Sequence, residues 1–161
     1  MFLRVWLSSG PTSRRTAPAV HLSVGAHLVG WVWTGPLTLA AKCLPGKGII
    51  VVSAAGNMGS NAAGHLQYGG ITAPGNAPWV LTVGASSTMG TLTRADDTMA
   101  PYSSSGPTYI DYIAKPDLVA PGTGTVSLAV PGSTFYSTKS AYRLGGKPEP
   151  GSTPFPALRG T

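Results

Sequence analysis

The chain has 161 residues, of which 42% are apolar and only 10% are charged, well below the roughly 25% charged residues of ordinary soluble domains. Disordered tails are rich in charge and poor in apolar runs, so this composition excludes one and favours a loop-rich globular domain with a core. The formal net charge of +6 comes with eleven Lys and Arg residues that are scattered along the chain, which indicates a basic surface and argues against nucleic acid as a partner.

Cysteine content and the length of the apolar runs exclude further classes of protein. Cys43 is the only cysteine, so the chain has no internal disulfide and no cysteine-based metal site. No apolar stretch reaches the roughly 18 residues of a transmembrane helix, so we expect no membrane partner. Met1–Ser9 is a poor secretion signal because it is short and contains Arg4, and the localisation is left open.

The N-terminal part divides into an arm and the start of a domain. Residues 1–18 show no period and are predicted to form an irregular arm, and the domain is predicted to occupy residues 19–161. Val20–Val24 alternates in polarity and is predicted as a short strand that ends at Gly25. Residues 26–34 are apolar and aromatic, which fits either a loop lying on the surface or a hydrophobic patch.

A helix and two strands are predicted next. Pro36–Leu44 has apolar residues at helical spacing, and its single cysteine is expected to have a buried, small apolar role. Gly48–Ala55 and Trp79–Gly84 are apolar runs rich in β-branched residues, as in strands buried on both faces of a parallel sheet. Strand, helix and strand with short connections predict an α/β fold. Turns and a short strand follow Tyr102, and the C-terminal third is predicted to be rich in loops.

Asn57 follows Gly56 at the end of the first apolar strand. Ligands of open α/β sheets bind outside the carboxyl ends of the strands. An asparagine placed there can aim its side-chain N–H groups into a cleft and stabilise the oxyanion of a tetrahedral intermediate. Taken alone, an asparagine after glycine at a strand end is more often a turn residue.

The sequence around Asn57 contains four blocks in a fixed order. They are Gly48-Ile-Ile-Val-Val-Ser-Ala-Ala-Gly-Asn57, Thr72-Ala-Pro-Gly-Asn-Ala-Pro-Trp-Val-Leu-Thr-Val-Gly-Ala85, Tyr102-Ser-Ser-Ser-Gly-Pro107 and Lys115-Pro-Asp-Leu-Val-Ala-Pro-Gly122. Together they resemble the subtilase (subtilisin-like, peptidase S8) family of serine endopeptidases. His21-Leu-Ser-Val-Gly25 is also similar to the family's Asn-Leu-Ser-Leu-Gly strand. The resemblance covers residues 20–128.

This resemblance implies a fold and a set of roles. The fold would be part of a three-layer α/β structure with a mostly parallel sheet, and the Ala73–Pro74 bond would be cis. Asn57 would be the oxyanion-hole donor, and an extended polypeptide would be the substrate. No cofactor or metal is implied, and the sequence has no phosphate loop and no metal-ligand spacing. Two walls of an apolar S1 pocket, one of which also pairs with the substrate backbone, would be formed by Ser23, Val24 and Gly25 and by Ala54, Ala55 and Gly56.

The catalytic residues of the family are not found in this chain. A subtilase needs Asp, His and Ser in that order, and the residues before the strand at Val20 contain neither Asp nor His. The tail Ala157–Thr161 resembles the family's Leu-Ser-Gly-Thr, so the chain is expected to end just before the nucleophile. His21, His27 and His65 are the only histidines, and no acid or nucleophile is predictably beside them.

Two hypotheses therefore remain open. The chain is either a catalytically incomplete fragment of a subtilase, or a non-enzymatic peptide-binding remnant that adds a substrate strand to the edge at Ser23–Gly25. In both cases the helix that carries the family's serine is absent, so one face and one edge of the sheet are expected to be bare. We therefore predict marginal solubility.

Overall fold

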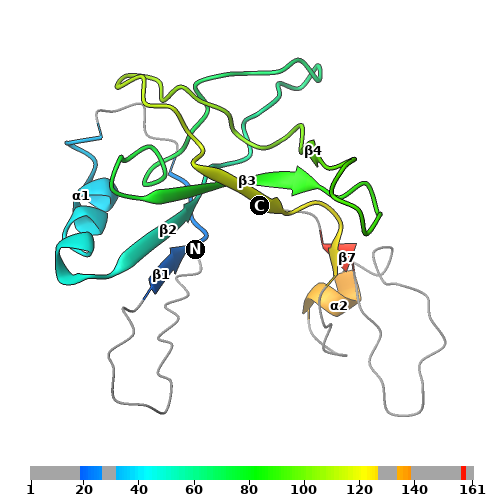
Figure 1. Cartoon of the computed structure of the whole chain (residues 1–161), viewed down its shortest axis with the longest axis horizontal. Coiled ribbons are helices and arrows are strands. Elements are labelled where there is room, and N and C mark those ends of the chain that lie inside the picture. Colours follow the sequence, from blue (N-terminus) through cyan, green and yellow to red (C-terminus); the bar gives the residue numbers. More distant parts are fainter. Residues whose placement is uncertain (1–18, 27–31, 127–133, 139–156, 159–161) are drawn as a thin grey trace, which may run out of the picture.

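The structure is a computed structural model that describes residues 19–26, 32–126, 134–138 and 157–158 (Figure 1). Its main feature is a five-stranded sheet, and a separate pair of strands lies nearer the C-terminus. The predicted arm, residues 1–18, lies outside the described residues. The strands are β1 (Ala19–Leu22), β2 (Ile50–Ala54), β3 (Leu81–Ser87), β4 (Thr98–Met99), β5 (Leu118–Pro121), β6 (Thr125–Val126) and β7 (Ala157–Leu158), and the helices are α1 (Pro36–Lys42), the 3₁₀ turn η1 (Pro45–Lys47) and α2 (Thr134–Thr138).

The sheet is mostly parallel, as the sequence predicts. β1 pairs with β2, β2 with β3 and β3 with β5, all in parallel, while β4 alone adds an antiparallel pairing at the end of β3. α1 connects the parallel strands β1 and β2, which is the predicted strand–helix–strand unit. β1 ends at Leu22, so Ser23 and Val24 lie just beyond the strand that the sequence predicts for them. Within the described residues no helix is long and apolar enough to cross a membrane.

The start of α1 is stabilised by Pro36 and Thr38, and the helix ends shortly before Pro45. Pro36 occupies the first turn, where its missing N–H group costs nothing, and the Thr38 hydroxyl donates to the Gly35 carbonyl oxygen at 2.7 Å. The helix ends at Lys42, and Pro45 begins the 3₁₀ turn. The expected burial of Cys43 is wrong, because this residue lies beyond the last helical turn and is exposed.

The core lies on the face of the sheet that α1 covers (Figure 1). Ala41 of α1 packs there with Leu22 and Val51, and the remaining buried members of this cluster are Val32, Ala77 and Val80. The opposite face has no such cover within the described residues. On it Ile50 is 54% exposed, and Leu81 and Leu118 are also exposed.

Burial of β2 on both faces is therefore a wrong prediction for this structure. The run of β-branched residues is present, but alternate residues of β2 point to opposite faces, and only Val51 and Ser53 are buried.

An ion pair between a buried lysine and a more exposed aspartate joins the beginnings of β3 and β5. The Lys115 ammonium lies 2.6 Å from a carboxylate oxygen of Asp117, and its side chain is only 2% exposed, against 35% for that of Asp117. Lys115 also donates to the Val80 carbonyl oxygen at 2.8 Å. Asp117 accepts a hydrogen bond from the Thr82 backbone N–H at 2.7 Å. Two strands that begin far apart in the sequence are thus fixed to each other by one charged pair.

This ion pair makes stability depend on pH in the acid range. Burial acts to raise the pKa of Asp117, but the hydrogen bonds from Lys115 and Thr82 and the charge of Lys115 outweigh it, so the pKa lies below its usual 3.8. A carboxyl group with a lowered pKa contributes stability above its unfolded-state pKa, and that contribution is lost as pH falls below it. We expect the urea midpoint to fall below about pH 4, and to fall less in Asp117→Asn. If the urea midpoint falls equally in the unsubstituted chain and in Asp117→Asn, other carboxyl groups cause the loss of stability in acid.

Candidate active site

Two loops leave the carboxyl ends of the neighbouring strands β1 and β2, where a parallel sheet binds its ligands. Ser23, Val24 and Gly25 follow β1. Ala54 ends β2, and Ala55, Gly56 and Asn57 follow it. Asn57, Ser23 and Gly25 are exposed, whereas Ala55 is fully buried. Val24 is half-buried and packs against the core cluster, so a wall at this position would be built from its backbone.

The side chain of Thr72 lies between the two loops. A Cβ atom added to Gly25 would lie 2.6 Å from the Thr72 hydroxyl oxygen, and one added to Gly56 would lie 2.9 Å from its methyl carbon. Thr72 is held there by its backbone N–H and its hydroxyl, which donate to the Ala55 carbonyl oxygen at 3.0 and 3.3 Å. Two glycines on separate loops thus make room for one threonine, which occupies the space between the predicted walls.

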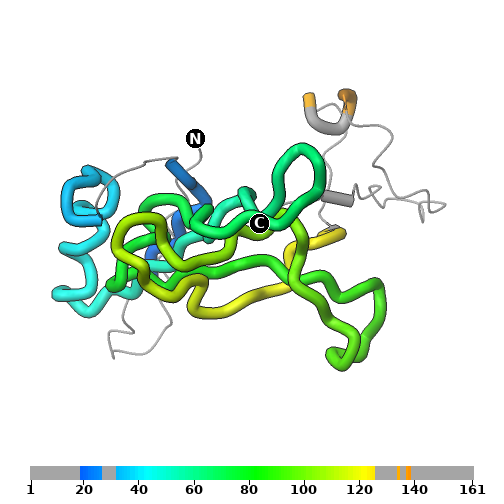
Figure 2. The backbone as a smooth tube through the Cα atoms, turned by 90° about the horizontal axis from the view of Figure 1, so that it is seen from above, coloured from blue at the N-terminus to red at the C-terminus, as the bar shows by residue number. Residues whose placement is uncertain are grey.

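The segment after Thr72 ties the same region together. Ala73 and Ala26 form an antiparallel bridge, with N–H to O distances of 3.0 and 3.1 Å, so the loop after β1 is paired on this side. The Ala73–Pro74 bond is cis, as the resemblance implies. The connection from β2 to β3 is long and irregular, and it can be followed in Figure 2 as the tube that passes from teal to green.

The turn that carries Asn57 begins with a glycine in an unusual conformation. Gly56 has a φ of +108°, a value that residues with a Cβ atom rarely adopt. Ser104 approaches this turn from a distant loop, and its hydroxyl oxygen accepts a hydrogen bond from the Met58 backbone N–H at 3.0 Å. Thr72 and Ser104 lie in two of the four sequence blocks quoted above, but both are in irregular segments without a period that could have placed their side chains beside the site.

The histidines do not assemble a catalytic triad among the described residues. His21 is exposed and its Nδ1 lies 3.3 Å from the hydroxyl oxygen of Ser23, but within the described chain no aspartate accepts a hydrogen bond from it. His65 is exposed on a loop, where its backbone N–H donates to the Asn61 side chain at 2.9 Å. His27 lies outside the described residues. No group of His, Cys, Asp or Glu side chains suited to a metal ion occurs in the described ranges.

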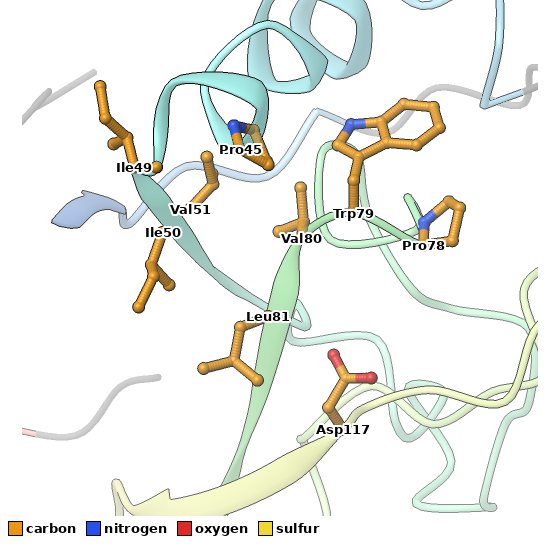
Figure 3. Close-up of a pocket in the computed structure, with 10 residues that line it drawn as sticks. Pro45, Ile49, Ile50, Val51, Pro78, Trp79, Val80, Leu81 and Asp117 are labelled. Carbon is orange, nitrogen blue, oxygen red and sulfur yellow. The ribbon is translucent and has the colours of Figure 1, made fainter. Parts of the chain in front are cut away.

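An apolar pocket of about 420 Å³ lies at the other end of the sheet (Figure 3). Its lining includes Ile50 and Leu81, the first residues of β2 and β3, together with Trp79 and the carboxylate of Asp117. Asn57 follows the carboxyl end of β2, so the pocket and the predicted site residues are at opposite ends of the strands. We place the candidate site at the carboxyl ends, because the residues with suitable chemistry and the crossing loops meet there.

Comparisons with known proteins identify the family of this chain. The sequence profile described as "Subtilase family" matches residues 20–148. The chain is 37% identical over 110 residues to the serine protease AprX of Bacillus subtilis (strain 168), which takes in 68% of this chain and 23% of AprX. It is 38% identical over 69 residues to the subtilisin-like protease SBT4.9 of Arabidopsis thaliana, covering 43% of this chain and 9% of that protein.

Solved structures show the same fold. Sphericase superposes with a TM-score of 0.50 at 24% sequence identity, over 69% of this chain and 34% of sphericase. This likeness concerns the fold alone. The chain spans about a quarter of the length of AprX, since the alignment covers 23% of that protein.

Proposed function

This chain belongs to the Subtilase family, and from that premise we propose that it forms part of a serine endopeptidase in which Asn57 donates a hydrogen bond to the oxyanion. The observation that carries the proposal is the position of Asn57, exposed on a turn at the carboxyl end of β2. An amide donor at such a point stabilises charge that develops only in the transition state. The proposal assigns residues 19–161 to the partial peptidase domain and residues 1–18 to an arm outside it.

The substrate would be a polypeptide bound in extended form. Its backbone would run along Ser23, Val24 and Gly25, and its P1 side chain would enter between this loop and Ala54, Ala55 and Gly56. Thr72 stands between the two loops and takes up space there, which supports a small P1 side chain. In this proposal the two walls orient the substrate, and the Asn57 amide stabilises the oxyanion. A nucleophile and a base must come from other residues.

The 161-residue chain by itself should therefore lack peptidase activity. A serine nucleophile needs a neighbouring base and a group that orients that base. The described residues offer only the contact between Ser23 and His21, without an acid. We expect no covalent labelling by a fluorophosphonate probe and no hydrolysis of a chromogenic peptide. Labelling at Ser23, or at any other serine, would overturn this part of the proposal.

A chimera with AprX tests whether this chain can supply its part of an active serine endopeptidase. In it the segment of AprX that aligns with this chain over 110 residues is exchanged for the corresponding residues of this chain, and AprX supplies the rest. The chimera should take up the fluorophosphonate label and hydrolyse the chromogenic peptide. A chimera that folds but neither takes up the label nor hydrolyses the peptide would contradict the proposed role of the segment.

Thr72→Gly should shift the P1 preference of this chimera towards large side chains. Removal of the threonine side chain opens the space that Gly25 and Gly56 now share with it. Because a single methylene group in a pocket is worth about 1–3 kcal/mol, we expect kcat/KM for a Phe substrate to rise at least tenfold relative to an Ala substrate. Thr72→Val keeps the size and removes the hydroxyl, so it serves as the matched control and should leave the ratio nearly unchanged. If Thr72→Gly leaves the ratio of kcat/KM for the Phe and Ala substrates unchanged, the P1 side chain does not bind beside Thr72.

A further inference from the structure

We propose that Ser104 is a positioning residue for Asn57, an inference that rests on the oxyanion role proposed above. Ser104 makes one hydrogen bond to each residue that flanks Asn57. Its backbone N–H donates to the Gly56 carbonyl oxygen at 2.9 Å, and its hydroxyl oxygen accepts from the Met58 backbone N–H at 3.0 Å. The backbone is therefore fixed immediately before and immediately after the residue whose side chain has to point in one direction.

The contact between Ser104 and the Asn57 turn is buried and leaves little space for larger side chains at Gly56 or Ser104. Ser104 is fully buried, so the N–H group of Met58 cannot exchange its lost partner for bulk water at no cost. A Cβ atom on Gly56 would lie only 2.9 Å from the Ser104 hydroxyl oxygen, in a backbone conformation with φ of +108°. A glycine in the turn and a short hydroxyl side chain in the facing loop are both needed for this approach.

The segment that contains Ser104 is itself anchored to the sheet. The carbonyl oxygen of Tyr102 accepts from the Gly59 backbone N–H at 3.0 Å, which adds a third bond to the Asn57 turn. On the other side, the hydroxyl oxygen of Ser103 accepts from the backbone N–H of Ala85 in β3 at 2.9 Å. The segment Tyr102–Ser104 thus connects the Asn57 turn to the central strand, and a site mounted on a regular element is held more firmly than one carried by a free loop.

Ser103 and Ser104 form a matched pair for a test. Both are buried, adjacent serines, and each hydroxyl oxygen accepts one backbone N–H. Ser103 is hydrogen-bonded to Ala85 in β3, whereas Ser104 is hydrogen-bonded to Met58 in the Asn57 turn. Their alanine variants should therefore lose similar amounts of stability and yet loosen different parts of the molecule.

Amide hydrogen exchange and ¹⁵N relaxation of the full 161-residue chain separate the two effects. In Ser104→Ala we expect the Met58 amide to exchange about tenfold faster, the equivalent of one lost hydrogen bond, while the Ala85 amide changes less than about twofold. The order parameter of the Asn57 backbone amide should fall from about 0.85 to below about 0.6, the range of flexible backbone. In Ser103→Ala the pattern should reverse, with faster exchange at Ala85 and an unchanged Asn57.

Every outcome bears on the proposal. Equal acceleration at Met58 in both variants would show that the Ser104 hydroxyl has no specific effect on the Asn57 turn and would overturn the proposal, and so would an unchanged Met58 amide in Ser104→Ala. If Ser104→Ala does not fold, Ser104→Cys takes its place, because a thiol has nearly the same shape and is a weaker acceptor. The exchange measurement is independent of catalysis. An inactive chimera would defeat the oxyanion role and leave this result standing, whereas a failed exchange test defeats the positioning role alone.

Discussion

Asn57→Ala in the AprX chimera is expected to lower kcat about 100- to 1000-fold and to leave KM nearly unchanged. Asn57 is exposed on the turn after β2, and in the proposed role its amide would act on charge that is absent from the bound substrate. Loss of such a donor therefore raises the barrier without weakening ground-state binding. The magnitude is the one known for the oxyanion-hole asparagine of subtilisin, a member of the same family, and is borrowed from it.

Asn61→Ala is the matched control for this experiment. Asn61 is also exposed, and its side-chain oxygen accepts the backbone N–H groups of Ala63 and His65, so its role is to shape its own loop. We expect its kcat to stay within about threefold of the unsubstituted chimera. If Asn57→Ala were equally mild, the amide would not contact the oxyanion, and the site would have to be placed elsewhere.

Asp117→Asn is expected to lower the free energy of unfolding by about 3 kcal/mol at neutral pH, the lower end of the range for removing one partner and leaving a buried charge uncompensated. The Lys115 side chain is 2% exposed and would lose its carboxylate partner, whereas the 35% exposure of the Asp117 side chain admits some water and reduces the loss. Urea unfolding followed by tryptophan fluorescence measures the change. If the starting stability is below this loss, the variant is unfolded without denaturant, and circular dichroism shows it.

Asp96→Asn provides the comparison for this charge loss. Its carboxylate accepts a hydrogen bond from the Thr91 hydroxyl on an exposed loop, with no buried cation beside it among the described residues, so the expected change is within about 0.5 kcal/mol. A loss below about 1 kcal/mol for Asp117→Asn would mean that solvent reaches Lys115 once the carboxylate is gone.

Much of the fold could be predicted because its elements have local causes. The β-branched runs around Val51 and Val83 predict two strands of a parallel sheet, and the proline at the start of α1 predicts a helix between the first two strands; both are confirmed. The four sequence blocks also identify the family, since each is a continuous stretch of the chain. The errors concern Cys43 and Ile50, whose exposure depends on which segments cover them. Periodicity along one segment carries no information about its neighbours.

The sequence by itself therefore determined the α/β class, the family and the position of Asn57 at a strand end, because each depends on a short continuous pattern. Only the tertiary structure decided what surrounds Asn57. Ser104 reaches the turn from 46 residues away, and Thr72 reaches Ala55 from 17 residues away while its side chain fills the space beside Gly25. Such contacts arise where irregular loops cross at the end of a sheet, and there the register of the strands and the absence of a Cβ atom on glycine decide which side chains can meet.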